Sequence, residues 1–197
     1  MEVPAKRFGA FMLSVFRDEF FARDAHGKSL PEGADEVKDL LGRLQRLDAA
    51  RIRSMFSGGS SATRDEATRL HAGRMLIRIV ESLNAAPDEA HRLIVHSGHD
   101  WTIIMLLMGL DPEGTDARTR DWPPFCSDLV FERWEDAKAG KEYVRVVLNG
   151  EALKLHHLVP HPKYPSLYTK ESLHDALEPF VLAEHQIEEA CKLPAEK

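Results

Sequence analysis

The feature that most constrains the fold is a short apolar segment that runs directly into a glycine turn and then into an apolar helix. Leu93-Ile94-Val95 is continuous, apolar and rich in β-branched residues, which is typical of a buried central strand. His96-Ser97-Gly98-His99-Asp100 follows, and an apolar segment then begins near Trp101. A strand, a turn and a helix in this order predict an α/β fold with a sheet flanked by helices.

The residues before this unit are predicted to be helical. Apolar residues recur at helical spacing between Phe8 and Phe20 and again from Val37 to residue 55. A flexible stretch at residues 57–61 precedes a third helix, for which Thr63 and Glu66 have the form of a capping box. This third helix is expected to end near residue 84 and to bury one face, made of Leu70, Gly73, Leu76, Ile77, Val80 and Leu83. We therefore predict a helical region over residues 1–90, on the N-terminal side of an α/β region over residues 91–197.

The α/β region should contain a hairpin. Residues 129–134 and 143–148 are predicted strands, joined by a loop that contains Gly140. Asn149-Gly150 is a strong hairpin signal, so residues 151–155 are predicted to return as a third strand. A proline-rich connection leads to a last predicted helix over residues 172–191.

Composition excludes several classes of protein. The chain is 43% hydrophobic, which is typical of a packed core, and it has no apolar run near the ~20 residues that a membrane span needs. Its net charge of −6 argues against a nucleic-acid partner. No small-residue cleavage site precedes Arg17, so we find no convincing signal peptide. Cys126 and Cys191 are compatible with one disulfide or with two buried thiols.

The turn between the predicted strand and helix is the candidate functional site. A helix N-terminus combines free backbone N–H groups with the positive end of the helix dipole, and Gly98 permits a close backbone approach. With a phosphate bound there, His99 could donate a hydrogen bond and Asp100 could protonate a leaving alcohol. A purely structural alternative stays open, in which Asp100 caps the helix and His99 is a packed turn residue.

Four segments resemble one known family. Ser97-Gly98-His99-Asp100, with Thr102-Ile103 opening an apolar helix, resembles the downstream catalytic signature of the histidine acid phosphatases, a branch of the histidine phosphatase superfamily. Residues 70–76, 122–132 and 143–151 are similar to neighbouring blocks of that family, in the family's order. The resemblance extends from about residue 65 to about residue 180.

The resemblance implies hydrolysis of phosphate monoesters through a phosphohistidine, with neither a cofactor nor a metal. It implies that His99 lies in the phosphate pocket and that Asp100 is the proton donor. Gly98, His99 and Trp101 are then the residues expected to contact a phosphate monoester or inorganic phosphate. In that family the nucleophilic histidine and two phosphate-binding arginines belong to an Arg-His-Gly-x-Arg-x-Pro segment nearer the N-terminus.

The sequence departs from the family pattern at this nucleophile. It contains no Arg-His-Gly, and its His26-Gly27 lies between predicted helices, so His26 is not assigned as the nucleophile. We expect the first catalytic strand to be absent and the activity to be impaired. Two alternatives stay open: a non-catalytic phosphate-binding or regulatory module, and an enzyme completed by an N-terminal segment from another polypeptide. Trp101 stands where the family usually has a small polar residue and is expected to narrow the pocket.

Other reactive side chains have simpler interpretations. His156, His157 and His161 match no metal-ligand spacing and are expected to be exposed loop residues, so no metal site is predicted. Cys126 lies in an apolar block and is expected to be buried. Glu132 is expected to face water on an edge strand, with a contact to the catalytic pocket as the alternative.

Overall fold

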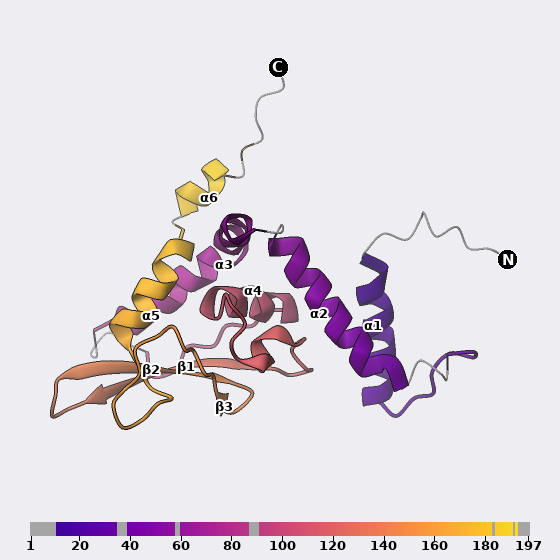
Figure 1. Ribbon diagram of the computed structural model, residues 1–197, viewed down its shortest axis with the longest axis horizontal. Helices are drawn as coiled ribbons and strands as arrows, with labels where there is room; N and C mark the ends of the chain where they lie inside the picture. The colour runs from indigo at the N-terminus through magenta and orange to yellow at the C-terminus, as the bar shows by residue number, and fades with distance from the viewer. Residues whose placement is uncertain are drawn as a thin grey trace, which may run out of the picture. The chain divides into compact units, whose positions relative to one another are not determined.

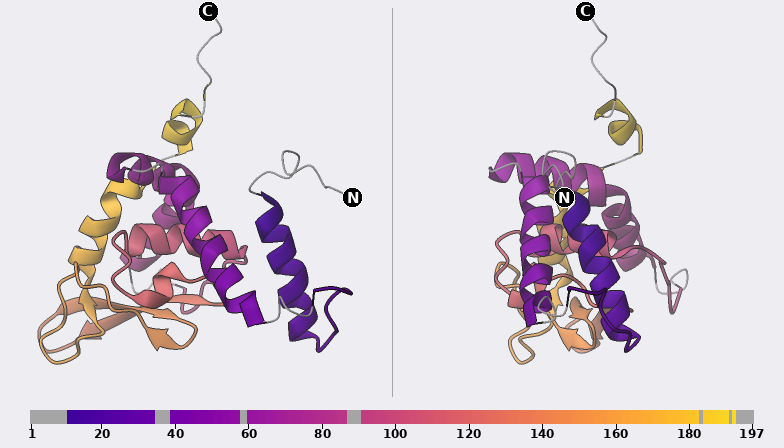
Figure 2. Two further views of the ribbon diagram at one scale, coloured as in Figure 1. Left: turned by 45° about the vertical axis from the view of Figure 1, so that its right-hand side comes forward. Right: turned by 90° about the vertical axis from the view of Figure 1, so that its right-hand side faces the viewer.

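The computed structural model describes residues 11–34, 39–57, 60–86, 91–182, 184–190 and 192 (Figures 1 and 2). The chain divides into two compact units, Met1–Ser54 and Met55–Lys197. None of the described helices is both long enough and apolar enough to cross a membrane. Several residues used in the sequence predictions lie outside the described residues, namely Phe8, Val37, Gly58, Gly59 and Cys191.

The first unit contains the two helices predicted for it. They are α1, Phe11–Ala25, and α2, Leu41–Ser57, whose last turn belongs to the second unit. A buried carboxylate links them: Asp48 is fully buried, and its Oδ1 accepts a hydrogen bond from Ser14 Oγ at 3.1 Å. Arg51 Nη2 lies 2.8 Å from the same oxygen. Removal of the Arg51 guanidinium or of the Asp48 carboxylate from this buried cluster would leave uncompensated charge. The cluster therefore fixes the pairing of α1 with α2.

In the second unit, α3 spans Ser61–Asn84 and begins earlier than predicted. Ser60 is the N-cap, because its backbone is extended and its Oγ accepts a hydrogen bond from Thr63 N at 3.1 Å. The predicted capping box that began at Thr63 is therefore wrong, whereas the predicted end at residue 84 is confirmed. Of the predicted buried face, Gly73, Leu76 and Leu83 are buried, and Leu70, Ile77 and Val80 are half-buried.

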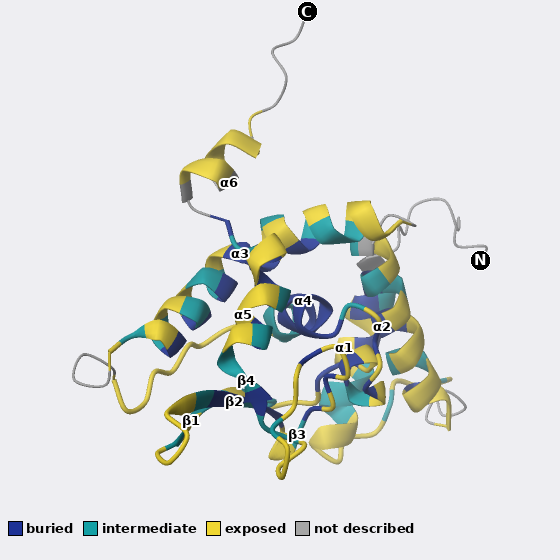
Figure 3. Ribbon diagram, turned by 60° about the vertical axis from the view of Figure 1, so that its left-hand side comes forward, coloured by how far each residue is buried: buried dark blue, intermediate teal, exposed yellow. Residues whose placement is uncertain are grey.

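Helix α4, Asp100–Leu110, lies between α3 and the sheet (Figures 1 and 2). Every residue from Ile104 to Leu110 is buried, as the dark blue of α4 in Figure 3 shows. Gly109 allows α4 to approach α3 closely, since a Cβ at this position would lie 3.3 Å from Thr68 Cγ2. The apolar segment that follows the turn is thus the central core helix of this unit.

The sheet is antiparallel and built around the predicted hairpin. β1, Leu129–Asp136, pairs with β2, Lys141–Leu148, along their whole length, and β3, Glu151–Ala152, returns against β2. Asn149 and Gly150 both have positive φ, 51° and 80°, as the predicted tight turn requires. β3 is shorter than predicted, and the two-residue strand β4, Tyr168–Thr169, which pairs with β2, was not predicted. The α/β class with a sheet flanked by helices is confirmed.

The strand predicted at Leu93-Ile94-Val95 is wrong for the structure described. These residues form no strand, and their exposed fractions are 78%, 44% and 77%. A central strand is buried only when neighbouring strands pair with it and both of its faces are covered. Among the described residues before β1 no strand forms at all, so this segment has no pairing partner there.

The single C-terminal helix predicted over residues 172–191 is also wrong. The chain forms α5, Lys170–Leu177, then the 3-10 turn η3, Glu178–Phe180, and then α6, Glu184–Ala190. Pro179 lies within η3 and cannot donate the backbone hydrogen bond that a continuous helix needs.

Candidate functional site

His99 is the N-cap of α4. Its backbone is extended, with φ −101° and ψ 161°, and its Nδ1 accepts a hydrogen bond from Trp101 N at 3.3 Å. Thr102 Oγ1 accepts in return from His99 N at 3.3 Å. The structural alternative is therefore wrong in its details, because His99 rather than Asp100 caps the helix and the His99 side chain is 75% exposed.

Asp100 is the first residue of α4, and its two carboxyl oxygens have different neighbours. Oδ1 accepts a hydrogen bond from Trp101 N at 2.8 Å and also contacts His99 Nδ1. Oδ2 accepts a hydrogen bond from Trp122 Nε1 at 2.8 Å. The structure thus brings an exposed imidazole and a carboxyl that is 27% exposed into direct contact. Such a pair can donate a hydrogen bond and exchange a proton with a bound group.

The backbone N–H groups at this helix N-terminus are less available than the sequence suggested. The amide of Trp101 is bonded to the neighbouring side chains, and Thr102 N donates to His99 O at 2.9 Å. Gly98 also has a local role, because a Cβ there would lie 3.3 Å from Thr102 Oγ1. Gly98 therefore lets the preceding residues approach the first turn of α4. The hydrogen-bonding groups of the site come mainly from side chains.

Trp101 packs against Phe56, which in turn packs against His71. Its ring centroid lies 6.0 Å from that of Phe56 in an edge-on arrangement, and Phe56 lies 4.6 Å from the ring of His71. Such edge-to-face pairs fix ring orientation. The indole is half-buried, so a role of Trp101 in contacting a ligand stays a prediction.

Trp122 is the site residue that the sequence did not identify. It is only 5% exposed and lies between the 3-10 turn η2, Ala117–Arg120, and the pair Pro123-Pro124. A buried indole N–H needs an acceptor, and this requirement is the signal that could have directed attention to Trp122. The partner, Asp100, is 22 residues away in sequence.

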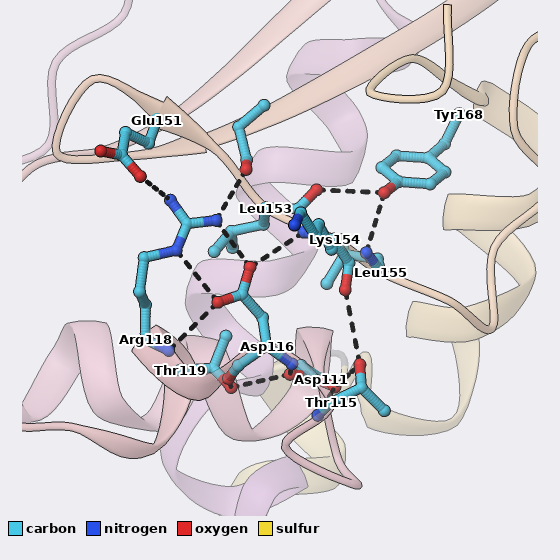
Figure 4. A network of polar contacts seen from close by, with 11 residues as sticks. Asp111, Thr115, Asp116, Arg118, Thr119, Glu151, Leu153, Lys154, Leu155 and Tyr168 are labelled. Carbon is cyan, nitrogen blue, oxygen red and sulfur yellow. Dashed lines mark hydrogen bonds and ion pairs between the residues drawn. The ribbon is translucent and has the colours of Figure 1, made fainter.

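A network of polar contacts holds the loop that leads to Trp122 (Figure 4). Asp111, fully buried at the end of α4, accepts hydrogen bonds from Thr115 N at 2.9 Å, Asp116 N at 3.0 Å and Thr119 Oγ1 at 2.7 Å. Burial pushes the pKa of Asp111 up, but these hydrogen bonds outweigh it and hold the pKa below its ordinary value. The loop therefore folds around a carboxylate that favours its charged form.

Asp116 and Arg118 connect this loop to the sheet (Figure 4). Arg118 Nε and Nη2 donate to the two oxygens of Asp116 at 3.0 and 2.6 Å, and Lys154 N donates to Asp116 Oδ2 at 3.1 Å. The guanidinium also reaches Glu151 Oε2 at 3.0 Å and Ala152 O at 2.7 Å. Hydrogen bonds from Arg118, opposed by burial, lower the pKa of Asp116 to about 2. The network therefore keeps its charge in acidic solution.

Glu132 lies on the edge strand β1, as predicted, but it has partners. Arg145 Nε, in the paired position on β2, donates to Glu132 Oε2 at 2.6 Å, and Trp134 Nε1 donates at 3.1 Å. The bond from Arg145 lowers the pKa of Glu132. This cross-strand pair explains the charged residue between aromatic neighbours.

The sequence predictions for Cys126 and for the three loop histidines have different outcomes. Cys126 is exposed with φ 59°, because it occupies a turn rather than the core, so its predicted burial is wrong. His156 and His157 are exposed as expected, whereas His161 is half-buried against Tyr143, with ring centroids 4.6 Å apart. Within the described part of the chain no three His, Cys, Asp or Glu side chains gather as a metal site.

Comparisons with known proteins identify relatives of this chain. The sequence profile of the histidine phosphatase superfamily (branch 2) matches residues 16–149. Human lysosomal acid phosphatase is 30% identical over 121 residues, which are 60% of this chain and 26% of that protein. Rat prostatic acid phosphatase is 27% identical over 121 residues, covering 60% of this chain and 29% of that protein.

A solved structure shares the fold. The phytase from Citrobacter braakii matches with a TM-score of 0.60 and 18% identity, over 88% of this chain and 49% of that chain. This chain therefore spans about half of that phytase and between a quarter and a third of these two acid phosphatases.

Proposed function

We propose a function from the premise that the chain belongs to the histidine phosphatase superfamily (branch 2). The proposed function is the binding of phosphate monoesters, and participation in their hydrolysis, at the turn that contains Gly98, His99 and Asp100. The observation that carries it is the contact between the exposed imidazole of His99 and the Asp100 carboxyl at the start of α4.

Each of the two side chains has a distinct proposed role. His99 is 75% exposed, so its imidazole is accessible to a ligand, and a neutral ring whose Nδ1 accepts from Trp101 N carries an Nε2–H that donates to a phosphoryl oxygen. Asp100, when protonated, hands its proton to the leaving alcohol as the P–O bond breaks. The positive end of the α4 dipole favours an anion at the same place.

We propose further that residues 1–197 alone hydrolyse phosphate esters slowly. The sequence has no Arg-His-Gly, and His26, in its His-Gly pair, lies in an exposed turn after α1. Without a histidine nucleophile the covalent route is unavailable, and only the weaker contribution of binding and acid catalysis remains. A non-catalytic phosphate-binding or regulatory module is the second candidate, and it is favoured by the same lack of a nucleophile.

An added segment that supplies the nucleophile is a third part of the proposal. Leu93 and Val95 are 78% and 77% exposed directly before the site, in a run that is apolar enough for a sheet interior. A strand from another polypeptide that paired with this run would cover these side chains and stand next to His99. Co-purification of the chain from its native source would show such a partner as a stoichiometric second polypeptide.

Phosphate binding is the direct test of the site. Calorimetry with inorganic phosphate at pH 5 should give a saturable isotherm that weakens at least tenfold in His99→Ala. His174→Ala, a change of an exposed histidine elsewhere in the same unit, is the matched control and should bind as the wild type does. Equal binding by His99→Ala and the wild type would overturn the assigned site.

Hydrolysis of p-nitrophenyl phosphate separates the catalytic and non-catalytic candidates. Slow turnover that falls further in Asp100→Asn supports participation in hydrolysis, whereas binding with no turnover supports the non-catalytic module. Rapid turnover that His26→Ala abolishes would show that His26 is the nucleophile and would overturn the proposed impairment.

A further inference from the structure

We propose that Trp122 is a positioning residue that fixes the Asp100 carboxyl with its transferable proton on Oδ1, the oxygen that faces His99. The inference rests on the proposed function, since Trp122 acts only through the proton-donor role of Asp100. The role of this buried side chain requires no contact between Trp122 and the ligand.

The two carboxyl oxygens lie in unlike surroundings. Oδ2 accepts from an indole N–H whose residue is 5% exposed. Oδ1 contacts the imidazole of His99, whose side chain is 75% exposed. Oδ1 is therefore on the side from which a ligand arrives, and Oδ2 is on the buried side.

The chemistry of the indole decides which oxygen carries the proton. An indole N–H is a donor only, so it donates to Oδ2 whether Asp100 is charged or neutral. In a neutral carboxyl group the carbonyl oxygen is the better acceptor, so donation to Oδ2 favours the form protonated on Oδ1. Oδ1 also accepts from Trp101 N, but it is the oxygen in contact with His99 Nδ1, which can accept the O–H.

The segment around Trp122 is built to keep the indole in place. On its N-terminal side, η2 is capped by Asp116, whose carboxylate binds Arg118 and Lys154 N. On its C-terminal side, Pro123-Pro124 restricts the backbone. The direction of the N–H is thus fixed by elements outside the turn that carries Asp100, which is what distinguishes positioning from a chance contact.

The sharpest perturbation removes the N–H and keeps the shape of the ring. Replacing Trp122 with 3-benzothienylalanine puts sulfur in place of the indole N–H, and Trp122→Phe is the simpler second variant. The readout is the set of three-bond NMR couplings that report χ1 of Asp100, measured without phosphate or turnover. We expect one χ1 rotamer in the wild type and averaged couplings in both variants.

The same replacement at Trp134 is the matched control. Trp134 also donates its N–H to a carboxylate, Glu132, but it is 45% exposed and belongs to β1, whereas Asp100 begins α4. Its replacement should leave the Asp100 couplings unchanged. Unchanged couplings after replacement of Trp122 would overturn the proposal, even if phosphate binding at His99 were established.

A pH titration of the indole N–H signals tests the link to the proton. The chain has three tryptophans, so three indole signals are expected, and the Trp122 variants identify one of them. The Trp122 signal should follow the protonation of Asp100 and lose that response in Asp100→Asn, while the Trp134 signal keeps its own response. A Trp122 signal that responds identically in Asp100→Asn, or not at all, would contradict the proposal.

Discussion

Replacement of Asp116 by Asn should destabilise the second unit in neutral solution and matter progressively less in acid. Asn has nearly the shape of a protonated Asp, so the variant imitates the wild type after acid has neutralised this one carboxylate. In the folded chain Asp116 is 7% exposed and is bound by Arg118 through both oxygens. The change therefore removes a buried, bidentate charge pair.

The expected magnitude follows from the pKa of the carboxyl. Folding lowers the pKa of Asp116 from 3.8 to about 2, and at about 1.4 kcal/mol per pKa unit this corresponds to about 2.5 kcal/mol of stability at neutral pH. Because the folded pKa is depressed, this contribution is complete above pH 3.8 and is lost as the pH falls through about 2. By the same linkage about half of it, roughly 1.3 kcal/mol, remains at pH 3.

Urea denaturation followed by tryptophan fluorescence is the appropriate assay, because Trp101, Trp122 and Trp134 all belong to the second unit. The difference in unfolding free energy between wild type and Asp116→Asn should be near its full value at pH 5 to 7 and should halve near pH 3. The matched control is Asp121→Asn, an exposed carboxylate of the same loop, which should change stability by less than about 0.5 kcal/mol. A pH-independent difference would refute the charge argument and assign the loss to packing.

Further substitutions at four positions test packing, turn geometry and exposure. Gly73→Ala would place a Cβ 2.9 Å from the backbone oxygen of Phe180, so we expect a loss of about 1–3 kcal/mol by urea denaturation. Gly42→Ala would meet only the flexible end of Arg46, whose Nη1 lies at an ordinary contact distance of 3.7 Å, and should instead gain up to about 1 kcal/mol; equal effects of the two would contradict the packing. Asn149→Ala must hold φ at 51° and should lower stability by about 1–2 kcal/mol, with a smaller loss for Asn149→Gly. Leu93→Thr should change the stability of the purified chain by less than about 0.5 kcal/mol, since Leu93 is 78% exposed; a loss above 2 kcal/mol would show that the segment is packed.

The parts of the fold that could be predicted from sequence have local determinants. The β1–β2–β3 hairpins follow from alternating apolar residues and from Asn149-Gly150, whose backbone preference is contained in two residues. The end of α3 and the apolar character of α4 are similarly local. The candidate site was predicted on the same local basis, because His99 and Asp100 are adjacent at a helix start.

The contacts that orient the candidate site are not local, and no pattern in the sequence indicates which residues pair. Trp122 reaches Asp100 across 22 positions, and Lys154 N reaches Asp116 across 38. Every buried donor or acceptor in the chain needs a hydrogen-bond partner, so this requirement alone does not identify which residue the partner is. The pairing depends on how α4, η2 and β3 pack, which is a property of the assembled unit.

The failed strand prediction at residues 93–95 follows from the same dependence on partners. An apolar, β-branched run is stable as a central strand only when neighbouring strands satisfy its backbone and cover its side chains. Here α4, directly after it, is buried without that help because α3, α5 and η2 pack against it. The candidate site therefore has buried contacts on one side, at Asp100 and Trp122, and exposed apolar side chains, Leu93 and Val95, directly before it. Hydrogen exchange at the backbone amides of Leu93–Val95 would show whether another strand pairs with this segment. Protection should be low in the purified chain and high once a covering strand is bound.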